Sequence, residues 1–404
     1  MYQCAVASYC LLSAEGELAV EVETLFDFST MQIRPLSRRL AAHTDRRTIA
    51  FSVCAPAKLS IEPDGDLHNP LFLLINPRET DVPNPQEPKV RYFAGGQEYD
   101  AGEILLGEGE TLYIEAGAVV YGHVVAERAD GARIRGRGIL CGSRIATQGQ
   151  PQQMVRIVQS KGIVVEGVTI VDGPSWHLVP VACENVEVRN VNIITFRGNG
   201  DGIDIVGDEN VAIGNCFVRS RDDCIALKSV HYVDPRGCRE VRHVRVCGCV
   251  LWNAEWGNAI EIGYETQSRE ICNVIFDDID IIHAEFEGYE SGGTLTIHNG
   301  DRGVVSHILY NNIRVEDSRE KLIDLKILFS KYSRDAQRGQ IRDIRFRNIQ
   351  IVGGMFPVSI IRGYDDTHKI EDVVIENLTV HGQKINNANA AKMVVEIAKN
   401  IKFL

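Results

Sequence analysis

Three features are absent or scarce in this sequence of 404 residues, and each limits the kind of protein that it can encode. No apolar run reaches about 18 residues, which excludes a membrane-spanning helix. Basic residues are the minority, with 43 Lys and Arg against 55 Asp and Glu, and the net charge of -12 disfavours nucleic acid as a partner. Helical periodicity is nearly absent, and only residues 388–399 have the pattern of a short C-terminal helix or cap.

The 11 cysteines are odd in number and scattered through apolar runs, which indicates buried thiols and not a disulfide framework. Cys247 and Cys249 are separated by one residue, which is not the spacing of zinc-binding pairs, so no metal site is expected. No basic segment precedes the mildly apolar run at the N-terminus, so a signal peptide is not expected. We therefore expect a cytoplasmic protein with no membrane partner.

The first 85 residues differ in pattern from the rest of the chain. They contain short runs in which apolar and polar residues alternate, such as 18–22, 48–53 and 58–62, separated by Gly, Pro and Asp. This alternation is typical of antiparallel strands with one solvated face. We expect an N-terminal β-sandwich domain over 1–85 and a second domain over 86–404.

From Val90 onward the chain repeats a short unit of the form x-V/I-x-V/I-x-N/G/D-x-x-V/I. Copies occur at 162–170, 184–193 and 209–218, and repeat lengths of about 22 to 35 residues lie in the range of solenoid units. Each unit buries its apolar face only by stacking on the next, and the insertions fall at the corners. The sequence therefore predicts an all-β protein, a parallel β-helix preceded by the small sandwich. Leucine-rich and propeller repeats are excluded because their signatures are absent.

Three aspartates occupy related places in two successive units. Asp201 begins D-G-I-D-I-V and Asp223 begins D-C-I-A-L-K, with Asp222 beside it. Equivalent residues of neighbouring turns stack about 4.8 Å apart, so the three carboxylates should repel one another and keep at least one proton near neutral pH. A protonated acid beside an ionised base is what glycoside hydrolysis requires. Asp and Asn-Gly also form ordinary turns, which is the structural alternative.

Other polar residues share columns with the aspartates, and alternation places these columns on the outer face of the coil. They are candidates for a sugar-binding groove, although outer faces are polar in any case. The candidate substrate-binding residues are Asn199, Asp204, Lys228, Asn258, Glu261, Thr296, His298 and Lys326, with His177 one turn earlier. The aromatic residues that could stack on sugar rings are Trp176, Tyr232, Trp252, Trp256, Tyr264 and Tyr289.

With these residues in place, the sequence resembles the polygalacturonase-like β-helix hydrolases, the clan of glycoside hydrolase families 28 and 49. The likeness runs from about Pro70 onward and is most specific in N-G-D-G-I-D at 199–204 and R-S-R-D-D-C-I-A-L-K at 219–228. The resemblance implies a right-handed, pectin-lyase-like β-helix and an inverting reaction. It also implies Asp222 as the general acid, with Asp201 and Asp223 activating the water.

Two departures from the family 28 pattern bear on the substrate. Gly257-Asn258-Ala259 stands where that family has Gly-His-Gly, and Thr296-Ile297-His298 stands where it has Arg-Ile-Lys to hold a galacturonate carboxylate. Loss of the Arg removes a strong carboxylate clamp. The N-terminal sandwich and segment 257–271 look more like the dextranases and isopullulanases of family 49. We therefore expect an inverting glycoside hydrolase that cleaves α-glycosidic bonds of a neutral oligo- or polysaccharide without a cofactor.

Three alternatives remain open. The first is a pectin hydrolase of the polygalacturonase type. The second is a polysaccharide lyase on the same scaffold, with Lys228, Arg221 or Lys326 as the base or carboxylate-neutralising cation and the Asp trio holding Ca²⁺. The third is a β-helix that binds glycans without cleaving them.

Overall fold

The computed structural model describes residues 7–146, 153–285 and 292–404, and β-strands dominate the described chain. The chain divides into two compact units, Met1–Pro83 and Asn84–Leu404, two residues ahead of the boundary expected after residue 85. The helical segments of the described residues are two short 3-10 turns, η1 (Leu36–Arg38) and η2 (Pro235–Gly237). None of the helices described could cross a membrane.

The N-terminal unit consists of two sheets, with strand orders β1-β7-β6-β3 and β2-β5-β4. Ile49 of the second sheet and Leu59 and Ile75 of the first belong to one apolar core, so the two sheets pack as a small sandwich. The strands are β1 (Ser8–Ser13), β2 (Gly16–Glu23), β3 (Met31–Arg34), β4 (Ala42–Asp45), β5 (Thr48–Ala55), β6 (Ala57–Pro63) and β7 (Leu71–Asn76).

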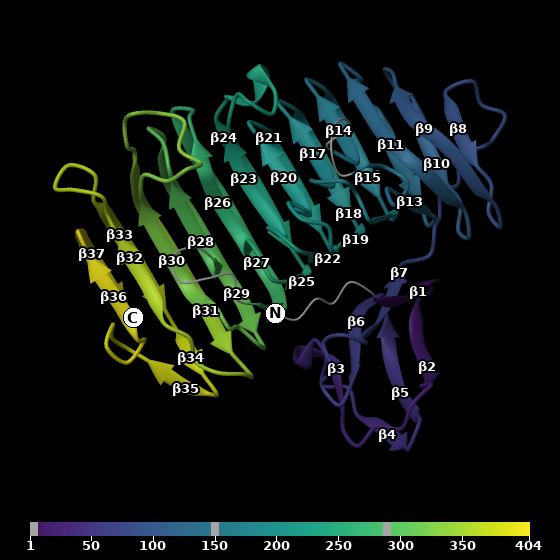
Figure 1. Cartoon of the computed structure of the whole chain (residues 1–404), viewed down its shortest axis with the longest axis horizontal. Helices are drawn as coiled ribbons and strands as arrows, with labels where there is room; N and C mark the ends of the chain where they lie inside the picture. Colours follow the sequence, from purple (N-terminus) through teal and green to yellow (C-terminus); the bar gives the residue numbers. More distant parts are fainter. Residues whose placement is uncertain (1–6, 147–152, 286–291) are drawn as a thin grey trace. The chain divides into compact units, whose positions relative to one another are not determined.

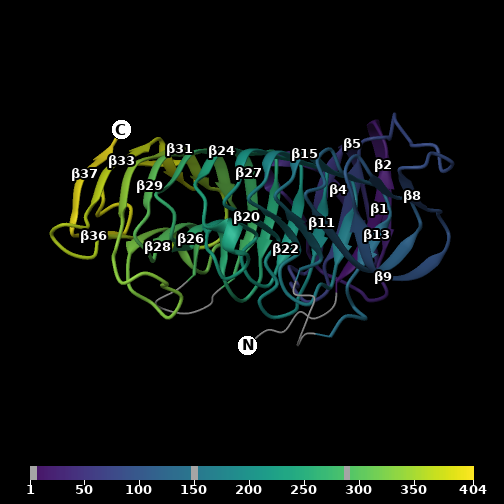
Figure 2. The same cartoon turned by 90° about the horizontal axis from the view of Figure 1, so that it is seen from above.

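The second unit is a right-handed parallel β-helix, in which each turn, or rung, pairs in parallel with the rung before and after it (Figures 1 and 2). Its strands form three stacks. Stack A contains β9 (Glu98–Leu106), β11 (Val119–Glu127), β14 (Val155–Val158), β17 (Leu178–Val181), β20 (Ile203–Val206), β23 (Ile225–Ser229), β26 (Asn258–Thr266), β28 (Gly293–Asn299), β30 (Lys321–Ile327), β32 (Ser359–Arg362) and β36 (Met393–Glu396).

Stack B contains β8 (Val90–Phe93), β10 (Thr111–Ile114), β12 (Arg133–Gly136), β15 (Lys161–Glu166), β18 (Glu184–Arg189), β21 (Glu209–Gly214), β24 (Val241–Cys247), β27 (Glu270–Ala284), β29 (Val304–Val315), β31 (Gln340–Ile351), β33 (Ile370–Glu376) and β37 (Ala398–Phe403). The starts of β9 and β11 and the ends of β27, β29 and β31 extend into stack C. Stack C otherwise contains β13 (Ile139–Cys141), β16 (Thr169–Val171), β19 (Asn192–Ile194), β22 (Phe217–Ser220), β25 (Val250–Asn253) and β34 (Leu378–Val380). Strand β35 (Gln383–Ile385) pairs antiparallel with β34.

The Asn, Gly or Asp of the repeated unit forms the corner between stacks B and C. Asn190, Asn215 and Asn312 have φ angles of 55°, 54° and 52°. Asn, Asp and Gly adopt this left-handed conformation at lower cost than other residues. The apolar residues on either side of the corner, such as Val188 and Val191, belong to one continuous core. The repeated motif of the sequence is therefore one strand, one left-handed corner and the start of the next strand.

The C-terminus differs from the expectation of a helix or cap over 388–399. Strands β36 and β37 occupy this region and pair in parallel with β32 and β33 of the preceding rung. Ile397, with φ of 52°, makes the turn between them. The apolar spacing resembled a helix, but pairing with the edge of the coil determines the local structure.

Candidate active site

Neighbouring rungs bring the three aspartates together. Asp201 precedes β20, Asp222 and Asp223 precede β23, and the two strands pair with Ile203 opposite Ile225. One carboxylate oxygen of each aspartate lies within 4.8 Å of the others. Asp201 and Asp223 are buried, whereas Asp222 is half-buried. The structure thus places the trio together, as the register of the repeats predicts.

Two residues of the next rung hold Asp222 and Asp223 in place. Gly257 has φ of +69°, and a Cβ there would lie 2.5 Å from Oδ1 of Asp222. Only glycine leaves space for the carboxylate at this point. Asn258 donates its backbone N–H and its side-chain amide to Oδ1 of Asp223, at 2.9 and 2.8 Å.

Lys228 supplies the positive charge of the site. Its Nζ lies 3.0 Å from Asp201, 3.2 Å from Asp204 and 3.5 Å from Asp223, and 4.3 Å from the ring centroid of Trp176. Burial by itself would lower the pKa of Lys228, but the three carboxylates outweigh it and raise this pKa well above its usual value. The side chain is therefore a fixed cation among the acids.

The pKa values of all three aspartates lie above the usual value for this side chain. Burial raises the pKa of Asp201 well above its usual value, helped by Asp204 and opposed by Lys228. Burial likewise raises the pKa of Asp223 well above its usual value and raises that of Asp222, again with Lys228 opposing. Groups this close titrate as a unit, so burial and mutual repulsion favour retention of a proton within the trio.

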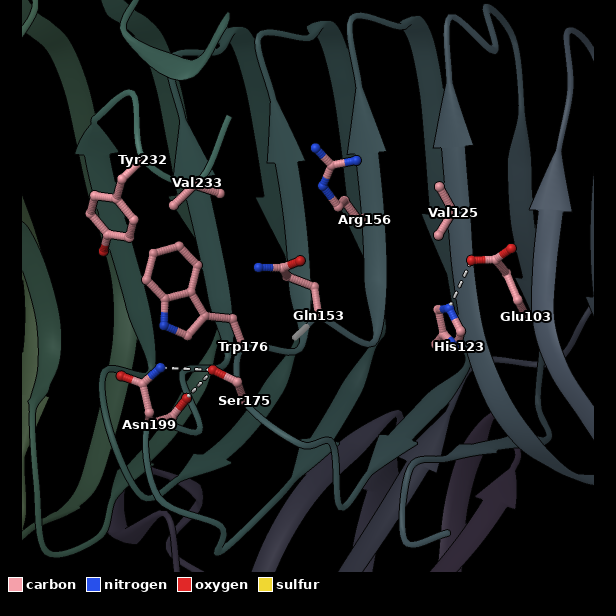
Figure 3. Close-up of a pocket in the computed structure, with 10 residues that line it drawn as sticks. All are labelled: Glu103, His123, Val125, Gln153, Arg156, Ser175, Trp176, Asn199, Tyr232 and Val233. Carbon is pink, nitrogen blue, oxygen red and sulfur yellow. Dashed lines mark hydrogen bonds and ion pairs between the residues drawn. The ribbon is translucent and has the colours of Figure 1, made fainter. Parts of the chain in front are cut away.

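A cavity of about 100 Å³ lies over the trio. Its lining comprises Trp176, Asn199, Asp201, Asp222, Asp223, Lys228, Tyr232, Gly257, Asn258, Tyr264, Glu265 and Tyr332. A larger cavity of about 770 Å³ shares Trp176, Asn199 and Tyr232 with it and extends along stack A toward the N-terminal rungs (Figure 3). Aromatic faces beside a few fixed polar groups are typical of a ligand-binding site.

Among the expected substrate-binding residues, Asn199, Lys228 and Asn258 line the cavity over the trio, and so do the aromatic candidates Trp176, Tyr232 and Tyr264. Three lining residues were not predicted as site residues from the sequence, Gly257, Glu265 and Tyr332. Tyr332 belongs to the corner after β30, and its ring centroid lies 5.2 Å from that of Tyr264. A column alignment of strands contains no signal for a residue contributed by a corner.

Other expected binding residues lie beneath the surface. Asp204, Glu261, Thr296 and His298 have no exposed surface, and Lys326 is buried with its Nζ 2.9 Å from Asp324. They lie on the outer face of stack A, as expected, but this part of the outer face is covered. Alternation predicts which face a side chain takes, and it does not predict whether that face meets solvent.

His298 is the centre of this buried group. Its Nδ1 lies 3.0 Å from Glu261, its Nε2 lies 3.2 Å from Asp324, and its ring stacks on Tyr264 at 4.6 Å. Burial would lower the pKa of His298, but Glu261 and Asp324 raise it to about 9. A charged His298 therefore supports Tyr264 from below, and its charge is balanced within the protein.

His177 and Trp256 do not line either cavity. His177 is fully buried; its Nε2 accepts the backbone N–H of Gly173 at 2.9 Å and its Nδ1 lies 2.9 Å from the carbonyl oxygen of Asp201. Burial lowers the pKa of His177 to about 4, so the ring is neutral and positions the backbone at Asp201. Trp256 is exposed and packs on Arg221, 4.1 Å from the guanidinium carbon.

Of the two remaining aromatic candidates, Trp252 does not line either cavity. Trp252 is completely buried, and its Nε1 donates to Glu285 at 3.0 Å. Tyr289 lies outside the described residues.

Comparison with known sequences supports the chemistry indicated by the trio. The sequence model of "Glycosyl hydrolases family 28" matches residues 118–398, which is more than half of the chain and includes all three aspartates. The polygalacturonase of Cryptomeria japonica is 27% identical over 196 residues, which cover 47% of this chain and 35% of that protein. The match thus spans about a third of the length of that relative.

Solved structures share the fold. The polygalacturonase from Erwinia carotovora ssp. carotovora has a TM-score of 0.58 at 17% identity and covers 72% of this chain and 83% of its own. Dex49A from Penicillium minioluteum has a TM-score of 0.62 at 15% identity, with coverage of 95% and 82%. At these identities the two structures show the β-helix fold alone. The family match, which extends over the trio and most of the coil, places this chain in glycosyl hydrolase family 28, whose members cleave O-glycosyl bonds.

Proposed function

We propose that this protein hydrolyses α-linked galacturonide polymers of the pectic type. The observation that most strongly supports hydrolysis is that one carboxylate oxygen of each of the three aspartates lies within 4.8 Å of the others. The relatives named polygalacturonase favour the pectic alternative over the neutral glycan expected from the sequence. That expectation rested mainly on Thr296 and His298, which replace an Arg and a Lys, and was supported by the features that resemble family 49; both residues are buried. Because these two side chains have no exposed surface, the lack of Arg and Lys at their positions does not exclude an acidic polymer as the substrate.

The exposure of the trio suggests the role of each member. Asp222 is the most exposed of the three, so its carboxyl group is the one able to reach the glycosidic oxygen as general acid. Lys228 contacts Asp201 and Asp223 and opposes the rise that burial causes in the pKa of both carboxyl groups, so we assign these two to accept the proton of the attacking water. A water between them loses a proton to one carboxylate and attacks the anomeric carbon, while the leaving oxygen takes the proton of Asp222.

The spacing of the trio is shorter than the sequence-based expectation for inversion. Inverting enzymes usually separate acid and base by about 6.5 to 9.5 Å, whereas about 5 to 5.5 Å is usual for retention. The nearest oxygens here lie within 4.8 Å. We nevertheless propose inversion because Asp201 and Asp223 both contact Lys228, which fixes the two carboxyl groups in place. A mobile water molecule beside them is the nucleophile that this arrangement favours.

Elimination by a lyase mechanism is less well supported. A lyase base must be neutral, but Lys228 contacts three carboxylates that raise its pKa. Arg221 is bound to Glu255 at 2.8 Å, and Lys326 is bound to Asp324. Lys228 also places its charge where a Ca²⁺ ion on the trio would need to be, and Ca²⁺ requires about six to eight oxygen ligands.

The test measures reducing-sugar release from polygalacturonate by the wild type, Asp222→Asn and Asp366→Asn. Asp366 is a matched control because it lies in an exposed turn. Loss of the general acid should lower kcat by roughly 100-fold or more, whereas Asp366→Asn should be unchanged. Undiminished turnover of Asp222→Asn would refute the acid role. Products that absorb in the near ultraviolet would indicate a lyase, and binding without cleavage by the wild type would indicate a glycan-binding protein.

A further inference from the structure

We propose that Arg156 recognises a uronate carboxylate of the polymer, in a subsite two rungs on the N-terminal side of Asp201. This inference deepens the proposed function and rests on it. The subsite is part of the cavity of about 770 Å³ that adjoins the trio. Figure 3 shows Arg156 between Trp176 at the trio end of this groove and His123 at its far end.

The register of stack A gives the separation along the groove. Arg156 in β14 lies opposite Val179 in β17, and β17 pairs in turn with β20, the strand that follows Asp201. Two strand spacings amount to about 10 Å along the coil. Arg156 is in register with Asp204, so it also lies three residues beyond Asp201 in the direction of the strands. Arg156 is therefore too far away to act on the reacting bond, but it lies where a neighbouring sugar of the same chain would pass.

The surroundings of Arg156 present its positive charge to the groove. Its Nη2 donates to Asp234 at 2.6 Å, and Asp234 is 4% exposed and does not line the cavity. The Arg156 side chain is 24% exposed and does line it. The counter-ion thus lies behind the guanidinium, whose remaining N–H donors are available to a ligand.

The charged residues are unevenly distributed along the larger cavity, which we call the groove. Among the described lining residues of the larger cavity, the one carboxylate is Glu103, which pairs with His123 at 3.3 Å. Gln153 and Arg156 lie between this pair and Trp176, so a carboxylate bound there meets donors and no unpaired acid.

The trio itself is a poor place for a uronate carboxylate. Its cavity has four acidic lining residues against one cation, Lys228, which is already bound. The positions that the resemblance assigns to carboxylate binding, Thr296 and His298, are buried, and the charge of His298 is balanced by Glu261 and Asp324. Recognition of the acid is therefore displaced to Arg156, whose planar fork matches a carboxylate.

The experiment compares kcat and KM on polygalacturonate and on a methyl-esterified polymer of the same length for the wild type, Arg156→Gln and Arg156→Lys. Arg133→Gln is the matched control, because Arg133 is an exposed arginine of stack B. Arg156→Gln should raise KM for the free acid by roughly 10- to 100-fold, with little change in kcat and little change for the ester. Arg156→Lys should restore part of the loss, since it keeps the charge without the fork.

A role limited to structure predicts a different result. Loss of the contact with Asp234 would then impair both polymers equally, and this outcome, or no change in KM for either polymer, would overturn the inference. A second measurement distinguishes failure of the Arg156 subsite from failure of the proposed function. Calorimetry compares binding of saturated oligogalacturonides to Asp222→Asn with and without Arg156→Gln. If the wild type cleaves neither polymer but this binding requires Arg156, the proposed function fails and the subsite stands; binding that is equal in both variants overturns the subsite.

Discussion

Nζ of Lys228 lies 3.0 Å from Oδ2 of Asp201, and the two residues come from neighbouring rungs of the coil. This contact is what allows a buried group of acids to exist between β20 and β23. Without the ammonium group, Asp201, Asp204 and Asp223 would face one another in a region from which water is largely excluded.

Lys228→Met should therefore change both stability and pH dependence. Removing one partner of a buried ion pair typically costs about 3–5 kcal/mol of unfolding free energy, measured by urea denaturation. Lys228 lowers the pKa of Asp201 and Asp223, so its loss should raise these pKa values and move the acidic limb of the kcat/KM profile to higher pH. Lys402→Met, at an exposed position of β37, should leave both measurements unchanged.

Gly257→Ala should impair turnover more than it impairs folding. The new Cβ would lie 2.5 Å from Oδ1 of Asp222 and 2.5 Å from the backbone N of Asp223, so Asp222, the proposed general acid, must move. A displacement of about 1 Å at a reacting group can cost roughly 100-fold in rate. Gly162 is the matched control because its φ of +68° is similar and nothing lies within 4 Å of its added Cβ. Gly162→Ala should share the backbone strain but keep kcat; equal rates in the two variants would contradict the steric argument.

His298→Gln should remove a component of stability that depends on pH. The pKa of His298 is raised to about 9, above the value of about 6.5 in an unfolded chain. A raised pKa stabilises the fold fully below pH 6.5, and this stabilisation is lost as the pH rises through 9. The contribution is roughly 3 kcal/mol. Unfolding midpoints measured from pH 6 to pH 10 should fall more steeply for the wild type than for the variant, and parallel curves would show that His298 is not charged in the folded protein.

The stereochemical prediction is inversion at the anomeric carbon. Proton NMR of the first product formed, recorded before mutarotation, should show the anomer opposite to that of the substrate bond. A first product with the substrate's own configuration would assign the nucleophile role to Asp201 or Asp223, and would agree with the short spacing of the trio.

The sequence predicted which strand residues share a column, but not which of these columns are exposed. The columns that contain Asp201, Asp223 and Asn258 are those of the structure, because paired strands keep a constant register. The same columns place Glu261, Thr296 and His298 correctly on stack A, yet these residues are buried. Arg156 belongs to the same strand stack but was not predicted as a binding residue. Its orientation depends on its contact with Asp234, a buried residue 78 positions later, and this contact has no signal in the sequence.

The amino-acid sequence by itself determined the coil, the left-handed corners and the meeting of the three aspartates. These features depend on local periodicity and on the constant distance between paired strands, which repeat from rung to rung. Only the tertiary structure decided which outer columns are covered and which open into the groove. That outcome depends on corners of variable length, such as those carrying Asp234 and Tyr332, whose contacts with the coil are specific to each corner and have no period in the sequence.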